Sequence, residues 1–157
     1  MKGRLLMHIV NYDGIYLEEI LSMIKESIQK INCDDYSEKQ IKTWSTIDKA
    51  SFEGSIPLYS KVMLSEKNAV IGYGDMTSNG YLDRLFVHKD WQRKDIATKL
   101  LDSLENSSNL TTFETYASIT AKPFFEKQHY YVVKENIATL KGLKFINYYM
   151  KKELAKD

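Results

Sequence analysis

The stretch YLDRLFVHKDWQRKDIATKLLDSLE (residues 81–105) joins a strand pattern directly to a helix pattern. Its first seven residues are mostly aromatic and aliphatic, as in a buried strand. Further along, apolar residues recur at steps of three and four and share one helical face: Ile96, Ala97, Leu100, Leu101 and Leu104. The stretch therefore predicts a strand at 81–87 and an amphipathic helix at about 94–106.

The loop before this helix and the helix's first turns are basic. Four cations stand there against two acids: Lys89, Arg93, Lys94 and Lys99 against Asp90 and Asp95. A helix N-terminus presents unpaired N–H groups and about half a positive charge, which suits a phosphate group. The same charges could simply be solvated around a surface helix, so this pattern alone leaves both interpretations open.

Periodicity elsewhere in the chain predicts six more strands and three more helices. The strands are expected at 4–10, 58–66, 69–76, 111–117, 130–135 and 143–153, and the helices at 14–30, 36–44 and 122–128. Lys67-Asn68 and residues 77–80 fit hairpin turns. Residues 45–57 are polar and contain Gly54 and Pro57, which predicts a loop with one helical turn.

This element order predicts an α/β (α+β) fold. A strand at 81–87, a helix and a strand at 111–117 form a parallel pair with a right-handed crossover. The sheet should therefore be mixed and mostly antiparallel, with one central parallel strand pair and helices on both faces. We expect residues 1–157 to form a single domain, since this length suffices to bury roughly 70% of the unfolded surface.

Composition argues against several classes of partner. A net charge of +1 gives no global attraction to nucleic acid or to an anionic membrane, and no segment has the ~20 apolar residues of a membrane span. Cys33 is the single cysteine, and it shows no metal-ligand spacing with the three histidines. We therefore expect a cytoplasmic protein without a metal, and the N-terminal residues predict a strand and no signal peptide.

Residues 85–97 resemble the central motif of the GNAT superfamily of acetyl-CoA-dependent N-acetyltransferases. That motif has a hydrophobic-x-Val strand end, about five residues, and then Gln/Arg-x-x-Gly-x-Gly/Ala at a helix start. The matching positions, with Asp95 where the family has its first glycine, are Leu85, Val87, Gln92 and Ala97. The predicted element order is also similar to that of the family.

A second motif of the family, Asn/Ser-x-x-Ala-x-x-x-Tyr-x-x-x-Gly-Phe, is similar to SITAKPFFEKQHY (118–130). Ser118 and Ala121 match, while Phe125 replaces the tyrosine, His129 replaces the glycine and Tyr130 stands for the final aromatic. The segments YSEKQIKTW and GLKFINYYMKKEL are similar to a branch of small bacterial GNAT proteins.

The resemblance implies an acyltransferase that moves an acetyl group from acetyl-CoA to a primary amine of a small molecule or peptide. The alternative is a non-catalytic acyl-CoA-binding or interaction domain with a degenerate site; a homodimer is the assembly that we consider for either. The cofactor-binding residues implied are Leu85, Phe86, Val87, Gln92, Arg93, Lys94, Asp95, Ile96, Ala97, Thr98, Ala121 and Phe125.

Asp95 replaces a glycine whose missing side chain would let a phosphate approach the backbone closely. An aspartate in the first helical turn would stabilise the helix by roughly 0.3–1 kcal/mol. Its charge would also repel a phosphate by on the order of 1 kcal/mol at ~4 Å in water. We expect weakened coenzyme binding, and loss of binding only if the side chain points into the cradle.

Asp83 is the candidate base or amine-binding group, because alternation would place it on one face with Tyr81, Leu85 and Val87. The alternative is an ion pair with Arg84 or a nearby lysine. Phe125 cannot protonate a leaving thiolate, so the other candidate catalytic residues are Tyr116 and Ser118, with Tyr130 and Tyr131 as further substitutes. Water could also protonate the thiolate.

The acceptor amine is expected near the first two helices. Tyr36, Gln40 and Trp44 are spaced by four residues and would line one helical face. They are therefore the candidate substrate-binding residues, with core packing as the alternative role, particularly for Trp44.

Overall fold

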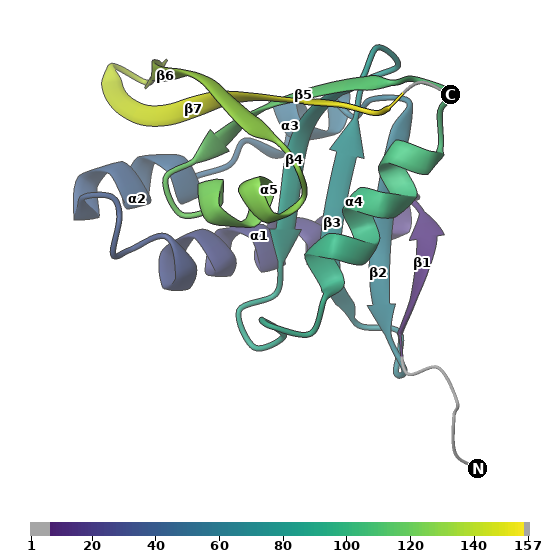
Figure 1. Cartoon of the computed structure of the whole chain (residues 1–157). Helices are drawn as coiled ribbons and strands as arrows, with labels where there is room; N and C mark the ends of the chain where they lie inside the picture. Colours follow the sequence, from purple (N-terminus) through teal and green to yellow (C-terminus); the bar gives the residue numbers. More distant parts are fainter. Residues whose placement is uncertain (1–6, 156–157) are drawn as a thin grey trace.

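The computed structural model describes residues 7–155, which form a seven-stranded sheet with helices on both faces (Figure 1). The strands are β1 (Met7–Asn11), β2 (Tyr59–Ser65), β3 (Val70–Met76), β4 (Tyr81–Val87), β5 (Thr112–Ser118), β6 (Tyr131–Leu140) and β7 (Leu143–Glu153). The helices are the 3-10 turn η1 (Gly14–Tyr16), α1 (Leu17–Ile31), α2 (Glu38–Ser45), α3 (Lys49–Gly54), α4 (Ile96–Asn106) and α5 (Lys122–Lys127).

The strand order is β1-β2-β3-β4-β5-β7-β6. Every neighbouring pair is antiparallel except β4 and β5, which are parallel. The predicted mixed sheet with one central parallel pair is therefore confirmed. The last hairpin folds back so that β7 pairs with β5, and β6 becomes an edge of the sheet.

Alternation along β3 separates the two faces of the sheet. Tyr73 is fully buried on the α1 side, where it contacts the Phe52 ring of α3. Gly72 faces α4, and a Cβ there would lie only 2.8 Å from the Ile96 side chain and 2.9 Å from that of Leu100. The absence of a side chain at Gly72 thus lets α4 lie directly on β3, which fixes where that helix begins relative to the sheet.

Residues 49–54 form the short helix α3, which agrees with the helical turn expected within the 45–57 loop, and the Asp48 side chain caps it by accepting a hydrogen bond from the Ser51 N–H. Other boundaries differ from the sequence prediction. α2 begins after the capping box of Ser37, so Tyr36 precedes it. β6 extends to Leu140, and residues 4–6 of the expected first strand lie outside the described residues.

A buried ionic cluster ties α4 to the last hairpin. The Glu105 side chain, 8% exposed, accepts hydrogen bonds from the Tyr130 hydroxyl at 2.6 Å and from Lys152 Nζ at 2.8 Å. Burial and the Glu105 carboxylate both raise the pKa of Tyr130, so its hydroxyl stays a donor at neutral pH. The three side chains come from α4, the residue before β6 and the end of β7, and they hold the hairpin against α4.

Glu105→Ala should lower the free energy of unfolding by about 3 kcal/mol, because it leaves a buried ammonium and a buried hydroxyl without their partner. Urea unfolding measures the loss. Glu126→Ala is the matched control, since Glu126 pairs with Lys122 across one exposed helical turn at 3.6 Å and should matter by less than about 0.5 kcal/mol. Equal losses in the two variants would contradict the role given to the cluster.

Candidate active site

The parallel strands β4 and β5 pair over only two positions and then diverge. The paired residues are Tyr81 with Glu114 and Leu82 with Thr115, and the Thr115 hydroxyl donates to the Leu82 carbonyl at 2.8 Å. Beyond this point the β5-facing edge of β4 has no strand partner. A cleft of about 1280 Å³ opens between the two strands and extends to the start of α4 on one side and to α1 on the other.

A β-bulge lies where the cleft begins. Arg84 is opposite Asp75 of β3, but Leu82 is opposite the next β3 residue, Met76, so Asp83 is an extra residue in β4. The expected alternation is wrong here: Leu82 and Leu85 both pack on the α4 side. Bulges re-aim side chains, and this one directs Asp83 into the cleft with its side chain 40% exposed.

The head of the cleft is a backbone turn at residues 93–98, which we term the cradle. Arg93 and Asp95 are left-handed, with φ of 63° and 61°, while Lys94 between them has a negative φ. The first bond of α4 runs from the Lys99 N–H to the Asp95 carbonyl at 3.0 Å, and none of residues 7–155 accepts a hydrogen bond from the N–H groups of residues 93–98. Such alternating backbone before a helix concentrates N–H groups on one point, which suits phosphate.

Asp95 stands where the backbone is left-handed, which explains why a glycine would also suit this position. Aspartate is among the residues that enter this region most readily. It is the residue before α4 and not part of its first turn, so the expected first-turn role is wrong. Its exposed carboxylate makes no capping hydrogen bond. Asp95 therefore adopts the backbone conformation that a glycine would have at this position.

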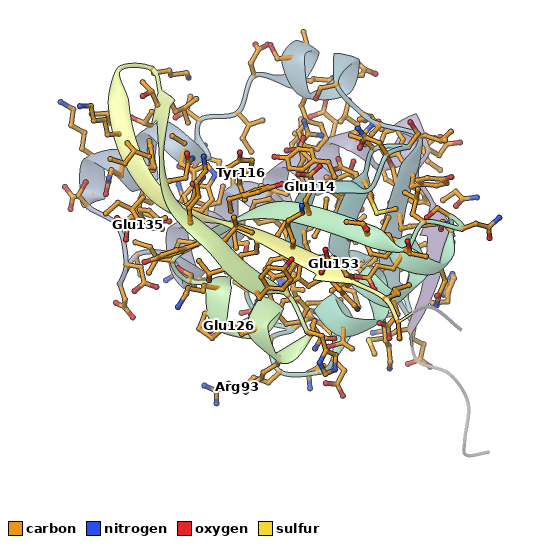
Figure 2. All side chains as sticks on the ribbon, turned by 45° about the horizontal axis from the view of Figure 1, so that its top comes forward. Arg93, Glu114, Tyr116, Glu126, Glu135 and Glu153 are labelled. Atoms are coloured by element: carbon orange, nitrogen blue, oxygen red, sulfur yellow. The ribbon has the colours of Figure 1, made fainter. Side chains whose placement is uncertain are left out.

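Gln92 closes the loop between β4 and α4. Its side-chain amide donates to the carbonyls of Val87 at 3.0 Å and His88 at 3.1 Å. These bonds hold the loop between β4 and α4 against the end of β4, so the Gln92 amide group is occupied by the protein's own backbone. Arg93 and Lys94 are exposed, and Figure 2 shows the Arg93 side chain extending away from the body of the molecule.

Comparison with known proteins agrees with this geometry. A model of the acetyltransferase (GNAT) domain matches residues 32–154. The chain belongs to the GNAT acetyltransferase family. The uncharacterized N-acetyltransferase YafP of Escherichia coli K12 is 30% identical over 146 residues, which are 92% of this chain and 95% of YafP.

Two solved structures share the fold. The GCN5-related N-acetyltransferase of Rhodopseudomonas palustris superposes with a TM-score of 0.88 at 25% identity, covering 97% of this chain and 100% of that one. The PaiA N-acetyltransferase of Thermoplasma acidophilum, solved in complex with coenzyme A, gives 0.74 at 17% identity, covering 95% and 99%. The GNAT fold predicted from the two motifs is therefore confirmed.

The GNAT cleft of this chain contains most of the predicted cofactor residues. Those that line it are Leu85, Phe86, Val87, Gln92, Arg93, Asp95, Ile96, Ala97, Thr98, Ala121 and Phe125. Lys94 is exposed and does not line the cleft. Phe125 is 4% exposed and packs on Tyr130, so the family's tyrosine position is filled here by a buried apolar ring.

Of the candidate proton donors, Tyr116 and Ser118 line the cleft on β5, whereas Tyr130 and Tyr131 do not. Ser118 Oγ accepts a hydrogen bond from the Ala121 N–H at 3.0 Å. Tyr116 is 41% exposed, and its ring lies between those of Tyr81 and Tyr149 on the face opposite α4 and α5. Figure 2 shows Tyr116 close to Glu114, which lies on the same strand, β5.

Tyr81 is a cleft residue that the sequence analysis did not select. Burial and the Asp83 carboxylate raise the pKa of Tyr81 to about 12, so its hydroxyl is protonated at neutral pH. The clue in the sequence was its position two residues before Asp83. Around Asp83 the structure thus gathers a neutral phenol and an exposed aromatic ring, Tyr116.

Asp75 is a second residue that sequence reasoning missed. It is fully buried on β3 and accepts hydrogen bonds from the Tyr73 hydroxyl at 2.6 Å and from Arg84 at 2.9 Å. Burial is the main cause that raises the pKa of Asp75 to about 6, against the lowering effect of Arg84. The Arg84 guanidinium also bonds Ser55 and lies 4.2 Å from the centre of the Phe52 ring. Asp75 therefore fixes Arg84 in the cleft wall beside Asp83.

Only two of the three predicted substrate residues line the cleft. Tyr36 and Trp44 line the cleft, but Gln40 does not. The Tyr36 hydroxyl donates to the Ile146 carbonyl at 2.8 Å and accepts from the Ile119 N–H at 2.9 Å, so it joins the α1–α2 loop to β5 and β7. Gln40 completes the capping box with Ser37 and donates to the Lys144 carbonyl.

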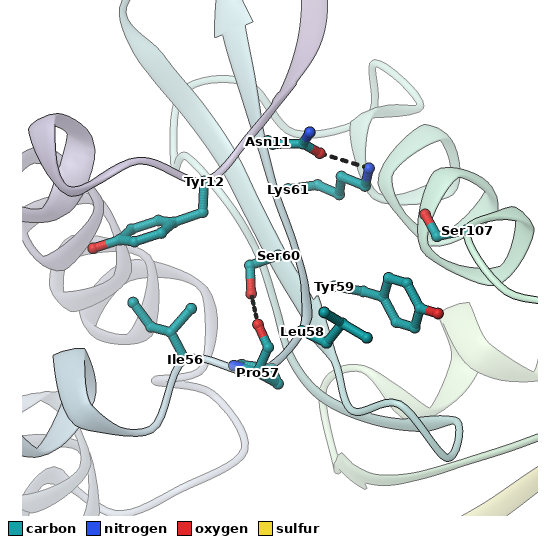
Figure 3. Close-up of a pocket in the computed structure, with 9 residues that line it drawn as sticks. All are labelled: Asn11, Tyr12, Ile56, Pro57, Leu58, Tyr59, Ser60, Lys61 and Ser107. Atoms are coloured by element: carbon teal, nitrogen blue, oxygen red, sulfur yellow. Dashed lines mark hydrogen bonds between the residues drawn. The ribbon is translucent and has the colours of Figure 1, made fainter.

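A second hollow of about 490 Å³ lies between the end of β1 and the α3–β2 loop (Figure 3). Within it Lys61 donates to Asn11 and Ser60 donates to the Pro57 carbonyl, while the buried Tyr12 hydroxyl has no hydrogen-bond partner among the described residues. Across residues 7–155, no group of three or more His, Cys, Asp or Glu side chains is arranged to hold a metal. No helix in the same range is long and apolar enough to cross a membrane.

Proposed function

We propose that this protein transfers the acetyl group of acetyl-CoA to a primary amine. The proposal rests on one observation: the backbone N–H groups of residues 93–98, at the head of a cleft between β4 and β5, have no hydrogen-bond acceptor among residues 7–155. A pyrophosphate fits such a cradle by charge and by hydrogen bonding. The coenzyme A complex of the PaiA relative supports the same assignment.

Each wall of the cleft would bind a different part of acetyl-CoA. The cradle from Arg93 to Thr98 would hold the pyrophosphate, with the side chains of Arg93 and Lys94 adding positive charge. The unpaired edge of β4 at residues 85–87 would form hydrogen bonds with the amide groups of the pantetheine arm, as a strand partner would. Ala121 and Phe125 would cover that arm from the α5 side.

The chemistry is direct attack of the amine on the thioester, which acetyl-CoA supplies as an activated acyl donor. The C–N bond forms, the C–S bond breaks, the amine loses a proton and the thiolate gains one. Asp83 would bind the ammonium and pass its proton toward solvent, and β4 N–H groups would polarise the carbonyl. Tyr116 and Ser118 lie on the β5 wall as candidate proton donors to the thiolate.

A second function is favoured by one observation. Phe125 places a buried ring without a hydroxyl at the position where the family has tyrosine. A domain that binds acyl-CoA without turning it over would need no donor there. Because the pKa of a thiol is near 8.5, a solvated thiolate leaves without an enzymic acid, and we therefore place the transferase first.

The test is incubation of the purified protein with acetyl-CoA and a panel of primary amines, with free thiol as the readout. The transferase proposal expects thiol release that depends on one class of amine. Calorimetric binding of CoA with no thiol release from any amine would support the binding domain. Absence of CoA binding would remove both functions.

Asp95→Gly should tighten CoA binding by about three- to tenfold, because it removes a like charge beside the pyrophosphate and the Cβ from a left-handed residue. Isothermal titration of CoA measures the change. Asp90→Asn is the control, because it removes a nearby exposed negative charge and leaves residues 93–98 unchanged. Weaker binding after Asp95→Gly would contradict this account of the position.

A further inference from the structure

We infer that the acceptor is a primary monoamine on an apolar body, with no carboxylate beside the amine. The inference rests on the proposed function and names the substrate class of the same site. It concerns the arm of the cleft that runs from Asp83 toward α1, α2 and the β6–β7 hairpin, which we term the acceptor arm.

The walls of the acceptor arm are mostly apolar. They come from five elements, and the apolar residues on them are Ile24, Ile28, Trp44, Phe52, Leu140 and Phe145. Ser27, Asn32 and Asn147 are polar residues in the same lining. Trp44 and Phe145 are in edge-to-face contact, with their ring centres 6.3 Å apart. The Tyr36 hydroxyl within this arm has both a donor and an acceptor in the protein. The arm therefore offers more area to an apolar group than to a polar one.

The charges around the acceptor arm leave room for one cation. Asp48 and Asp83 line the arm together with Arg84 and Lys141, and buried Asp75 stands behind Arg84. Arg84 is paired with Asp75 at 2.9 Å, which leaves Asp48 and Asp83 in the lining against Lys141, an excess of one negative charge when Asp75 is ionised. Asp48 already caps α3, and Arg84 lies farther from Asp83, at 3.9 Å, so Asp83 at the bulge is the carboxylate most open to an incoming ammonium.

A carboxylate next to the amine would fit badly. Arg84 is the nearest cation, but Asp75, Ser55 and the Phe52 ring already hold its guanidinium. An amino acid would place its own carboxylate close to Asp83, where like charges repel. A polyamine would have to bury additional ammonium groups against apolar walls, which is costly without partners. A single ammonium on an aromatic or aliphatic group would pair with Asp83 and place its apolar part against the apolar walls.

The decisive comparison uses 2-phenylethylamine and L-phenylalanine, which differ only by the carboxylate, with spermidine as the polyamine. Thiol release from acetyl-CoA gives kcat/KM for each. We expect the value for 2-phenylethylamine to exceed the other two at least tenfold, since a site that leaves a charge unpaired discriminates strongly. A higher value for L-phenylalanine or spermidine would overturn the inference while leaving the transferase proposal standing. Thiol release from no amine would overturn both.

A pair of variants tests the apolar wall itself. Leu140→Ser changes a side chain that is 38% exposed and lies on the face of β6 that Ala138 shares with Phe145, so the fold should tolerate it. Ile137 on the same strand points to the opposite face, is 59% exposed and lies outside the cleft lining, so Ile137→Ser is the matched control. Leu140→Ser should lower kcat/KM for 2-phenylethylamine about tenfold and that for ethylamine less than twofold. Equal changes for the two amines, or in the two variants, would overturn the inference.

Discussion

Arg84→Met should lower the free energy of unfolding by about 3 kcal/mol at pH 8 and by much less at pH 5. In the wild-type protein Arg84 is the partner of Asp75, whose side chain is fully buried. One Asp75 oxygen, Oδ1, has no hydrogen-bond partner among the described residues, so the carboxylate depends on Arg84 and Tyr73. Methionine would fill the space over Phe52 but leave the carboxylate without a counter-charge.

The direction of the pH dependence follows from the pKa of Asp75, which burial raises from 3.8 to about 6. A raised pKa in the folded state means that the folded protein holds this proton more tightly than the unfolded chain does. The stability contributed by the protonated form is fully present below pH 3.8 and is lost as pH rises through the folded-state pKa. Without Arg84 that pKa would rise further, so the deficit of the variant should be small at pH 5 and large at pH 8.

The control is the double variant Asp75→Asn/Arg84→Met, in which neither member of this pair carries a charge. Replacing both partners of a buried pair is often nearly neutral, so the double variant should recover most of the loss at pH 8. Urea unfolding at both pH values measures all three proteins. A loss in Arg84→Met that is equal at pH 5 and pH 8 would show that packing over Phe52, and not the charge on Asp75, is responsible.

The fold was predictable because its signals are local. Hairpin turns at residues 66–69 and 77–80, the latter ending in left-handed Gly80, set the antiparallel strands. The strand, helix and strand around α4 imply the parallel pair without any long-range information. The basic loop before an amphipathic helix is also visible in the sequence, but the left-handed backbone at Arg93 and Asp95 is not.

The chemistry around the cleft was less predictable because it depends on register. Simple alternation put Asp83 on one face with Leu85, but a single extra residue in β4 breaks that alternation. The same register places Arg84 opposite Asp75, a pair separated by a hairpin and invisible to periodicity. The acceptor arm forms only where α1, α3 and the β6–β7 hairpin lie side by side. These elements are far apart in the sequence, so no local pattern predicts their contact.

Asp83→Asn should lower kcat/KM for the amine about 100-fold while leaving CoA affinity unchanged. Of the carboxylates lining the cleft, Asp83 is the one that the bulge places where β4 and β5 diverge, beside the protonated Tyr81 hydroxyl. Asparagine keeps the shape but neither attracts an ammonium nor accepts its proton, and a positioned acid or base contributes typically 10²–10⁴-fold. The cradle lies in a different segment, so the pyrophosphate contacts should persist.

Steady-state thiol release and CoA calorimetry on the same preparation separate the two roles. Asp102→Asn is the control, because Asp102 is an exposed acid on α4 that does not line the cleft. If Asp83 only forms an ion pair with Arg84, at 3.9 Å, its loss should leave turnover unchanged at every pH and the residue has no part in the chemistry. If it receives the ammonium, the deficit should appear mainly in kcat/KM at neutral pH, because asparagine carries no charge to attract the ammonium. The two assays thus decide whether Asp83 takes part in the chemistry or only holds Arg84.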